Sequence, residues 1–261
     1  MTSPSFDAAA ETYDQTRGFP PGIGEAVARV ALEWIGGRRR VVEVGIGTGR
    51  IAIPLLACGA TVTGVDLSWQ MMQRLRRALP CELAPPGLVQ GDAGHLPLAA
   101  GSFDAVISVH VFQLLGDWLS ALAEVRRVLR AGGVFLNGYE WRPPDSPGAR
   151  LMEHWRVMVQ ANGSSPHSAA ARDFADLKAD LLAMGARCEE RPVGEWTTTR
   201  TLARQIETIE HRTWSPGWVL PEELSARALA ELRAWAVTEY GALDSVHEVP
   251  HRFIWQRFTW K

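Results

Sequence analysis

The chain has 261 residues, 46% of them hydrophobic, and a formal net charge of -2 at pH 7. A chain of this length and composition can bury a full apolar core. A net charge so close to zero gives no broad basic field, and nucleic-acid binding draws most of its affinity from neutralised phosphates. The composition therefore disfavours nucleic acids and large polyanions as partners.

The cysteines and the apolar runs indicate the compartment. The chain has three cysteines, Cys58, Cys81 and Cys188, an odd number without C-x-x-C spacing. This pattern favours a reducing compartment and argues against a structural zinc site. Residues 1–14 lack the basic and apolar segments of a secretory signal. No uninterrupted apolar run approaches the roughly 20 residues that span a bilayer. We expect a cytoplasmic protein without a membrane partner.

The first half of the chain predicts a helix followed by alternating strands and helices. The helix covers residues 22–35, after Pro20-Pro21. A later helix is capped by Asp117 and expected to end at Gly132, with a buried stripe of Trp118, Leu122, Val125 and Leu129. Strands are predicted at residues 41–44, 61–65, 88–90, 105–109 and 134–139. This alternation predicts a parallel sheet whose strand ends share one rim.

The second half begins with a proline-rich loop at residues 141–147, which suggests the boundary of an insertion. Helices are expected at residues 151–160, 173–184, 201–212 and 221–240. An antiparallel strand is expected at 186–193, and a last strand at 249–260 would complete a reversed hairpin with it. We interpret residues 1–261 as one domain. Its parts are an N-terminal lid and first helix (1–35), a cofactor core (36–140), a mainly helical cap (141–248) and a final strand (249–261).

Three glycines at alternate positions follow the first predicted strand, in Glu43-Val44-Gly45-Ile46-Gly47-Thr48-Gly49. Glycines adopt positive φ cheaply and let backbone amides approach a ligand. Asp66 ends the second predicted strand, where a carboxylate can accept two hydrogen bonds from a ribose diol. The spacing indicates an adenosine-containing ligand. The third glycine of the dinucleotide pattern G-x-G-x-x-G is replaced by Arg50 or Ala52, which disfavours a pyrophosphate.

The glycine segment resembles motif I of the class I methyltransferases that depend on S-adenosyl-L-methionine (SAM). Further segments resemble that family in the same order, from about residue 10 to residue 140. They are a Y-D-x-x-R element (10–17), the acidic strand end (66–72), the next loop (90–98), motif IV (102–110) and a helix-glycine-strand segment (122–135) in which Ala131 replaces the usual proline. The resemblance implies a Rossmann-like, seven-stranded and mostly parallel sheet, with helices on both faces and a helical cap insertion.

The resemblance also implies a set of cofactor-binding residues. In it, Asp66 binds the ribose, Met71 packs against the adenine, and Asp92 and the amide of Ala93 bond to the adenine edge. Glu43 orients the glycine loop or receives the cofactor ammonium through water. Tyr13 closes over the site and Arg17 pairs with the cofactor carboxylate. The full implied set is Tyr13, Arg17, Glu43, Gly45, Ile46, Gly47, Asp66, Leu67, Met71, Asp92, Ala93 and Ser108.

His110 is the candidate catalytic residue, because the match to motif IV places it beside the reacting methyl group. A neutral imidazole can take a proton from the acceptor near neutral pH. The alternative is a histidine that only shapes the pocket. His247 and His251 have i, i+4 spacing, but Pro250 between them interrupts a helix, so we expect no metal.

Tryptophans gather in the second half, where eight of the eleven follow residue 140. An aromatic cap suits a flat or apolar acceptor and keeps water from the transfer site. Each single tryptophan is more often a core residue than a pocket residue. Trp141, Trp214 and Trp218 lie in loop-like contexts and are the candidate substrate-binding residues.

Together these patterns predict metal-independent methyl transfer from SAM to a small molecule by direct in-line displacement. Two other classes stay open at this point. A SAM-sensing binding protein without catalysis would keep every cofactor residue. A nicotinamide-dependent oxidoreductase would use the same sheet, but the glycine register opposes it.

Overall fold

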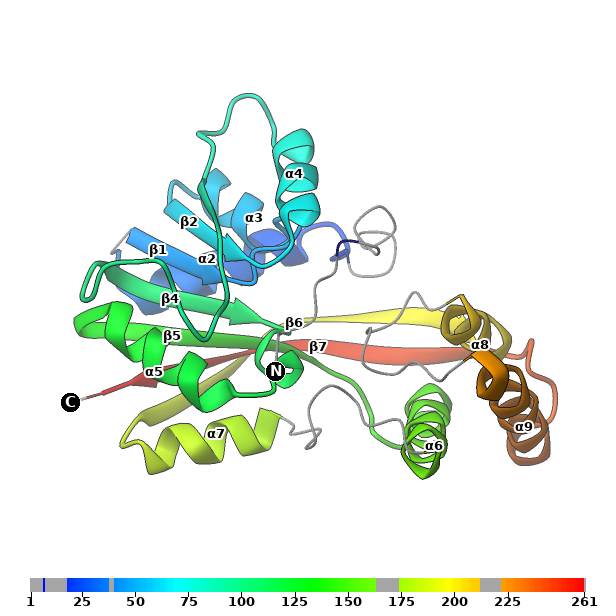
Figure 1. Cartoon of the computed structure of the whole chain (residues 1–261). Coiled ribbons are helices and arrows are strands. Elements are labelled where there is room, and N and C mark those ends of the chain that lie inside the picture. The colour runs from blue at the N-terminus through cyan, green and yellow to red at the C-terminus, as the bar shows by residue number, and fades with distance from the viewer. Residues whose placement is uncertain (1–6, 8–17, 38–39, 163–173, 212–221, 261) are drawn as a thin grey trace. The chain divides into compact units, whose positions relative to one another are not determined.

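The computed structural model describes residues 7, 18–37, 40–162, 174–211 and 222–260 (Figure 1). Two compact units make up the chain. The first takes in the described parts of Met1–Tyr139, Ala171–Gly194 and Phe253–Lys261, and the second those of Glu140–Ala170 and Glu195–Arg252. Among the described helices, none is long and apolar enough to cross a bilayer.

One seven-stranded sheet runs in the order β3-β2-β1-β4-β5-β7-β6. Its central strands β2, β1, β4 and β5 pair in parallel, as does β3 with β2. The strands are β1 (Arg40–Val44), β2 (Thr61–Asp66), β3 (Gly87–Gln90), β4 (Phe103–Val109), β5 (Leu129–Trp141), β6 (Arg187–Thr201) and β7 (Val246–Thr259). This confirms the Rossmann-like, mostly parallel sheet. The reversed strand is β7, so the expectation that the strand near residues 186–193 would run antiparallel is wrong.

The helices follow the predicted periodicity. Those of the first unit are α2 (Ile23–Ile35), α3 (Ala52–Ala57), α4 (Trp69–Ala78), α5 (Trp118–Val128) and α7 (Phe174–Ala183), with a short 3-10 helix η2 (Phe112–Leu114). The second unit contains α6 (Pro147–Ala161), α8 (Leu202–Glu210) and α9 (Glu222–Tyr240). Asp117 caps α5 as predicted, accepting a hydrogen bond from the amide of Ser120 at 3.1 Å.

The end of α5 differs from the prediction. The helix stops at Val128, and Leu129, expected on its buried stripe, already begins β5. The carbonyls of Arg127 and Val128 accept hydrogen bonds from the amides of Gly101 and Ser102, both at 2.9 Å. Because this neighbouring segment satisfies the last carbonyls of the helix, no glycine is needed to end it. Gly132 instead lies inside β5, at a φ of 69°.

Both faces of the sheet in the first unit are covered, which explains the nearly continuous apolar strands. On one face, Phe135 of β5 packs between the rings of Phe112 and Phe258, with centroids 5.5 and 5.8 Å away. The buried side chains of α5 and α7 join this cluster. On the opposite face, the indole of Trp255 donates to the carbonyl of Val27 in α2 at 3.0 Å. Trp255 is thus a core residue.

The second unit has a core of its own, built by α6, α8 and α9. Ala228 and Leu232 of α9 are buried there. Trp155 is also buried in this core, and Trp235 stacks on His154 with ring centroids 4.1 Å apart. These tryptophans therefore serve packing, in line with the more common role of the residue.

Candidate functional site

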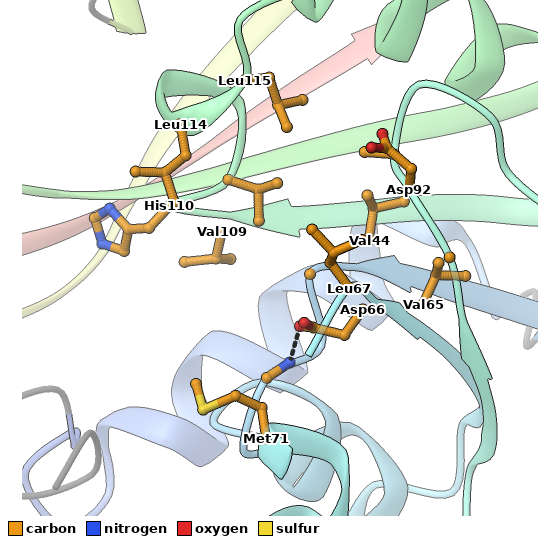
Figure 2. A pocket seen from close by; sticks show the side chains of 15 residues that line it. Val44, Val65, Asp66, Leu67, Met71, Asp92, Val109, His110, Leu114 and Leu115 are labelled. Carbon is orange, nitrogen blue, oxygen red and sulfur yellow. Dashed lines mark hydrogen bonds between the residues drawn. The ribbon is translucent and has the colours of Figure 1, made fainter. Parts of the chain in front are cut away.

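A pocket opens in the first unit at the carboxyl ends of β1, β2 and β4 (Figure 2). Its walls are the glycine turn after β1, the segment after β2, the loop after β3 and the segment after β4. Parallel strands bring their carboxyl ends to one edge, where ligands bind in open α/β sheets. The lining is mainly apolar, with Asp66, Asp92 and His110 as its ionisable side chains. This composition, an apolar lining with a few polar groups, suits a small organic ligand.

The turn after β1 presents bare backbone to the pocket. Gly45 and Gly47 both line it and both have positive φ, 76° and 54°. A Cβ on Gly45 would lie 2.2 Å from Cγ2 of Val111, so a side chain there collides with the segment after β4. A Cβ on Gly47 would lie 3.6 Å from Cε of Met71 and 4.0 Å from the carbonyl oxygen of Gly45, at ordinary contact distance from both. Any side chain at position 47 would therefore fill part of the pocket.

Asp66 ties the end of β2 to this turn. Its Oδ2 accepts a hydrogen bond from the amide of Gly47 at 2.8 Å (Figure 2), and its Oδ1 accepts one from the amide of Ser68 at 2.8 Å. Burial raises the pKa of Asp66, although the bonds from Ser68 and Gly47 oppose that shift. A carboxylate oxygen accepts more than one hydrogen bond, so both keep capacity for ligand hydroxyls.

Glu43, two residues before the first glycine, is a buried carboxyl group with 2% of its surface exposed. Its Oε2 has no hydrogen-bond partner within the part of the chain that the structure describes. Burial raises the pKa of Glu43 well above its usual range, the negative charge of Asp66 raises it further, and Arg50 opposes both. A buried carboxylate oxygen without a donor fits a ligand that brings a positively charged group.

Two further segments carry predicted residues into the pocket. Ser68 caps α4, where its Oγ accepts from the amide of Met71 at 3.2 Å, and this start of the helix sets Met71 at the pocket. Leu67 lines it as well. Figure 2 shows Met71 reaching the pocket from α4 and Asp92 from the loop after β3. Ala93 follows Asp92 in the lining.

The side chains of Ile46 and Ser108 do not line the pocket. Ile46 is buried against Gly64, where an added Cβ would lie 2.2 Å from its Cδ1. Ser108 is fully buried between Val44 and Asn137 in the sheet, and its Oγ has no hydrogen-bond partner among the described residues. Only the backbone of these two residues is available to a ligand at the rim.

His110 lines the pocket directly after β4. Its φ is 58°, in the left-handed region that residues with a Cβ seldom adopt, and it is the only non-glycine residue with positive φ in the described chain. Such backbone strain often occurs at functional sites. His110 thus belongs to the pocket lining, and its catalytic role stays a prediction.

The remaining predicted residues are either absent from the pocket lining or not described by the structure. Tyr13, Arg17, Trp214 and Trp218 lie outside the described residues. Trp141 belongs to the second unit, is 40% exposed and has the guanidinium of Arg252 5.6 Å from its ring centroid.

His251 is committed to hydrogen bonds in the second unit. Its Nδ1 accepts from Nε of Arg142 at 3.2 Å, and its Nε2 lies 2.8 Å from Oγ1 of Thr198. Across the described residues, no three His, Cys, Asp or Glu side chains gather as metal ligands would.

Sequence reasoning missed part of the lining. Val111, Leu114 and Leu115 line the pocket from η2 and its flanks, and Val44, Val65, Gly91 and Val109 complete the wall. The available signal was the mostly apolar segment at residues 111–115, soon after the predicted strand end. An apolar segment at that place has to cover either the core or the ligand.

A bare glycine turn bonded to an acidic strand end, at the rim of this sheet, defines an α/β protein that binds a nucleoside-type cofactor. Residues 42–137 match the family described as the methyltransferase domain. Demethylmenaquinone methyltransferase of Beutenbergia cavernae is 34% identical over 171 residues, which cover 62% of this chain and 70% of that protein. On this similarity, the chain belongs to the class I SAM-dependent methyltransferases.

Other relatives agree with this family. An uncharacterized methyltransferase of Mycobacterium tuberculosis is 34% identical over 144 residues, which cover 54% of this chain and 53% of that protein. The chain thus spans about half the length of the mycobacterial relative. The crystal structure of a putative methyltransferase from Bacillus halodurans C-125 shares the fold, with a TM-score of 0.62 at 16% identity over 92% of this chain and 99% of that one.

Proposed function

We propose that the protein binds SAM in this pocket and transfers its methyl group to a small-molecule acceptor. The observation that carries the proposal is the bond of 2.8 Å between the amide of Gly47 and Asp66, which joins a bare turn to a ribose-type acceptor. The buried Oε2 of Glu43 beside that turn supports it, because the amino-acid end of SAM brings an ammonium. The family to which the chain belongs uses SAM as its methyl donor.

We assign each of the described residues to one part of the cofactor. Asp66 accepts from the ribose hydroxyls, and the backbone of Gly45, Ile46 and Gly47 faces the amino-acid end. Glu43 receives the ammonium or holds the turn in place. Met71 and Leu67 flank the adenine, Asp92 and the amide of Ala93 bond to its edge, and Ser108 contributes backbone at the rim. We assign closure over the cofactor to Tyr13 and Arg17, on the family resemblance alone.

Bound SAM supplies a methyl group on a positively charged sulfur, which is already a strong electrophile. The protein then has to align the acceptor in line with that carbon and keep water away, and needs no metal. The apolar side chains of Val111, Leu114 and Leu115 supply the dry wall. We assign to His110 the removal of a proton from acceptors that must lose one.

We assign acceptor recognition to the cap at residues 141–248, with Trp141, Trp214 and Trp218 as its aromatic contacts. The relative from Beutenbergia cavernae is named as a demethylmenaquinone methyltransferase. A demethylated menaquinone therefore belongs in the first panel of acceptors, together with other flat and apolar molecules. Its ring would suit aromatic contacts.

Calorimetry tests the cofactor assignment. We expect SAM and its demethylated product to bind the wild-type protein, and Asp66→Ala to weaken both by about 10²-fold, since a hydrogen-bonded charge is worth roughly 1.5–3 kcal/mol. Asp244→Ala, at an exposed position of the second unit, is the control and should bind as wild type does. Binding of NADH in place of SAM would refute the assignment. Binding of SAM with no labelled methyl transfer to any acceptor would favour a SAM sensor.

A further inference from the structure

Two side chains on α5 grip the loop that follows β3. Arg127 donates from Nη1 to the carbonyl of Leu98 at 2.7 Å and from Nη2 to the carbonyl of Leu96 at 2.8 Å. Glu124 accepts from the amide of Leu96 at 2.7 Å. The two side chains also bind each other through Nε and Nη2 of Arg127, at 2.7 and 2.8 Å. We call this arrangement, Glu124 and Arg127 with the backbone of Leu96 and Leu98, the α5 clamp.

The α5 clamp holds a segment that begins at the pocket. The loop doubles back on itself, because an added Cβ on Gly91 would lie only 2.9 Å from Cδ of Pro97. Within it, Oδ1 of Asp92 accepts from the amide of Gly94 at 2.8 Å, and the carbonyl of Asp92 accepts from the amide of His95 at 3.0 Å. A movement at residues 96–98 therefore displaces residues 91–93, which line the pocket.

The chemistry of the α5 clamp makes it stronger than an ordinary surface pair. Its side chains are 18% (Glu124) and 36% (Arg127) exposed, and each has backbone groups as partners besides the other. The hydrogen bond from Arg127 holds the pKa of Glu124 below its usual range, so the carboxylate stays charged. The flat guanidinium reaches two carbonyls and a carboxylate at once through a rigid fork of donors, a geometry that the compact ammonium of a lysine does not reproduce.

The far end of the loop is fixed without these side chains. The amides of Gly101 and Ser102 donate to the backbone carbonyls of Arg127 and Val128. Removing the side chains of the α5 clamp would therefore leave the approach to β4 in place. The effect would fall on residues 91–98.

We propose that Glu124 and Arg127 are positioning residues that set the affinity of the pocket for SAM, by holding the loop that faces the adenine in its binding conformation. This inference rests on the proposed function. Without the α5 clamp the loop would spend only a fraction of its time in that conformation, and the apparent Kd rises in inverse proportion to this fraction.

The test compares Arg127→Met, Arg127→Lys and Glu124→Gln with a matched control on α6. Arg156 binds Glu153 at the same i, i+3 spacing, with Nε 2.6 Å from Oε2, and also bonds to the side chain of Gln160 on its own helix. Arg156→Met therefore removes the same kind of ion pair away from the loop. Two quantities are measured: the Kd for SAM by calorimetry, and amide exchange of residues 91–98 in cofactor-free protein.

We expect Arg127→Met to raise the Kd about tenfold, as a loop closed about a tenth of the time would, and to speed exchange in residues 91–98. Arg127→Lys, which keeps the charge but not the fork, should also bind SAM more weakly, and Arg156→Met should match wild type. The Kd for the demethylated product should rise by the same factor, because it shares the adenosine. Thermal unfolding identifies any variant that fails to fold, and the milder Arg127→Lys and Glu124→Gln then decide.

Unchanged amide exchange and an unchanged Kd in folded Arg127→Met would overturn the proposed role of the α5 clamp. The proposed function would still stand if the wild-type protein binds SAM. Equal weakening of SAM binding in Arg156→Met would also overturn that role, because the loss of any such ion pair would then be enough to lower the affinity. A wild-type protein that does not bind SAM would overturn the proposed function and this inference together.

Discussion

Glu43 is a carboxyl group that folding takes out of water without giving its Oε2 a donor. Burial, with help from the charge of Asp66, raises its pKa well above the ordinary value of 4.5. Over the pH range between the unfolded and folded values, the folded state therefore holds a proton that the unfolded chain has lost. The stability of the cofactor-free protein should fall as pH rises from about 4.5 through the folded pKa.

Glu43→Gln removes this titration and keeps the shape of the side chain. We expect the free energy of unfolding of the variant to gain on that of wild type as pH rises from about 4.5 to 8, because only wild type loses the proton. Asp66, whose pKa is raised mainly by its own burial, is present in both proteins, so this burial affects both curves. Urea unfolding at a series of pH values measures the difference in the free energy of unfolding between the two proteins. If this difference stays constant with pH, the prediction is contradicted.

His110 combines an unusual backbone with a place at the pocket. Asn tolerates positive φ better than most residues, so His110→Asn should keep the fold and the Kd for SAM. If the imidazole takes a proton in the reaction, as we assign, methyl transfer should slow by roughly 10²-fold or more. Transfer rates for an acceptor found in the screen measure the effect. An unchanged rate would leave His110 only the role of shaping the pocket.

At the scale of the element, periodicity predicted the helices and strands because each buries one face or both. Strands β1, β2 and β4 are found where apolar runs lie, and α5 begins at the predicted cap Asp117. The misplaced end of α5 has a physical cause that no local pattern contains. Its last carbonyls are satisfied by Gly101 and Ser102, which are more than twenty residues earlier in the chain.

In the candidate site too, local features could be predicted from the sequence, whereas contacts between segments far apart in the chain could not. Glycines with positive φ and a strand-end aspartate are local features, so Gly45, Gly47 and Asp66 were predictable before any fold was known. The grip of α5 on residues 96 and 98 depends on two segments meeting in space, about thirty residues apart. The direction of β7 is likewise a property of the whole sheet, since an apolar strand reads the same in either direction.

At the scale of the whole molecule, the second unit has its own apolar core, and the pocket lies in the first. Leu232 of α9 is fully buried in that core, so Leu232→Ala should lower the free energy of unfolding by about 2–5 kcal/mol. The core around Leu232 and the cluster that includes the pocket residues Val44 and Leu115 share no residue among those described. We therefore expect the Kd for SAM to stay within about twofold of wild type well below the melting temperature, because substitutions that share no contact partners usually act independently.

Thermal unfolding and calorimetry on the same Leu232→Ala sample measure both quantities. Leu122→Ala is the matched variant in the first unit, since Leu122 is equally buried but packs in the cluster that includes Val44. We expect it to lose stability by a similar amount and to weaken SAM binding as well, because a cavity there relaxes the wall behind the pocket. Equal loss of SAM affinity in both variants would mean that the core of α6, α8 and α9 supports the pocket, and that the two units respond to a cavity as one body.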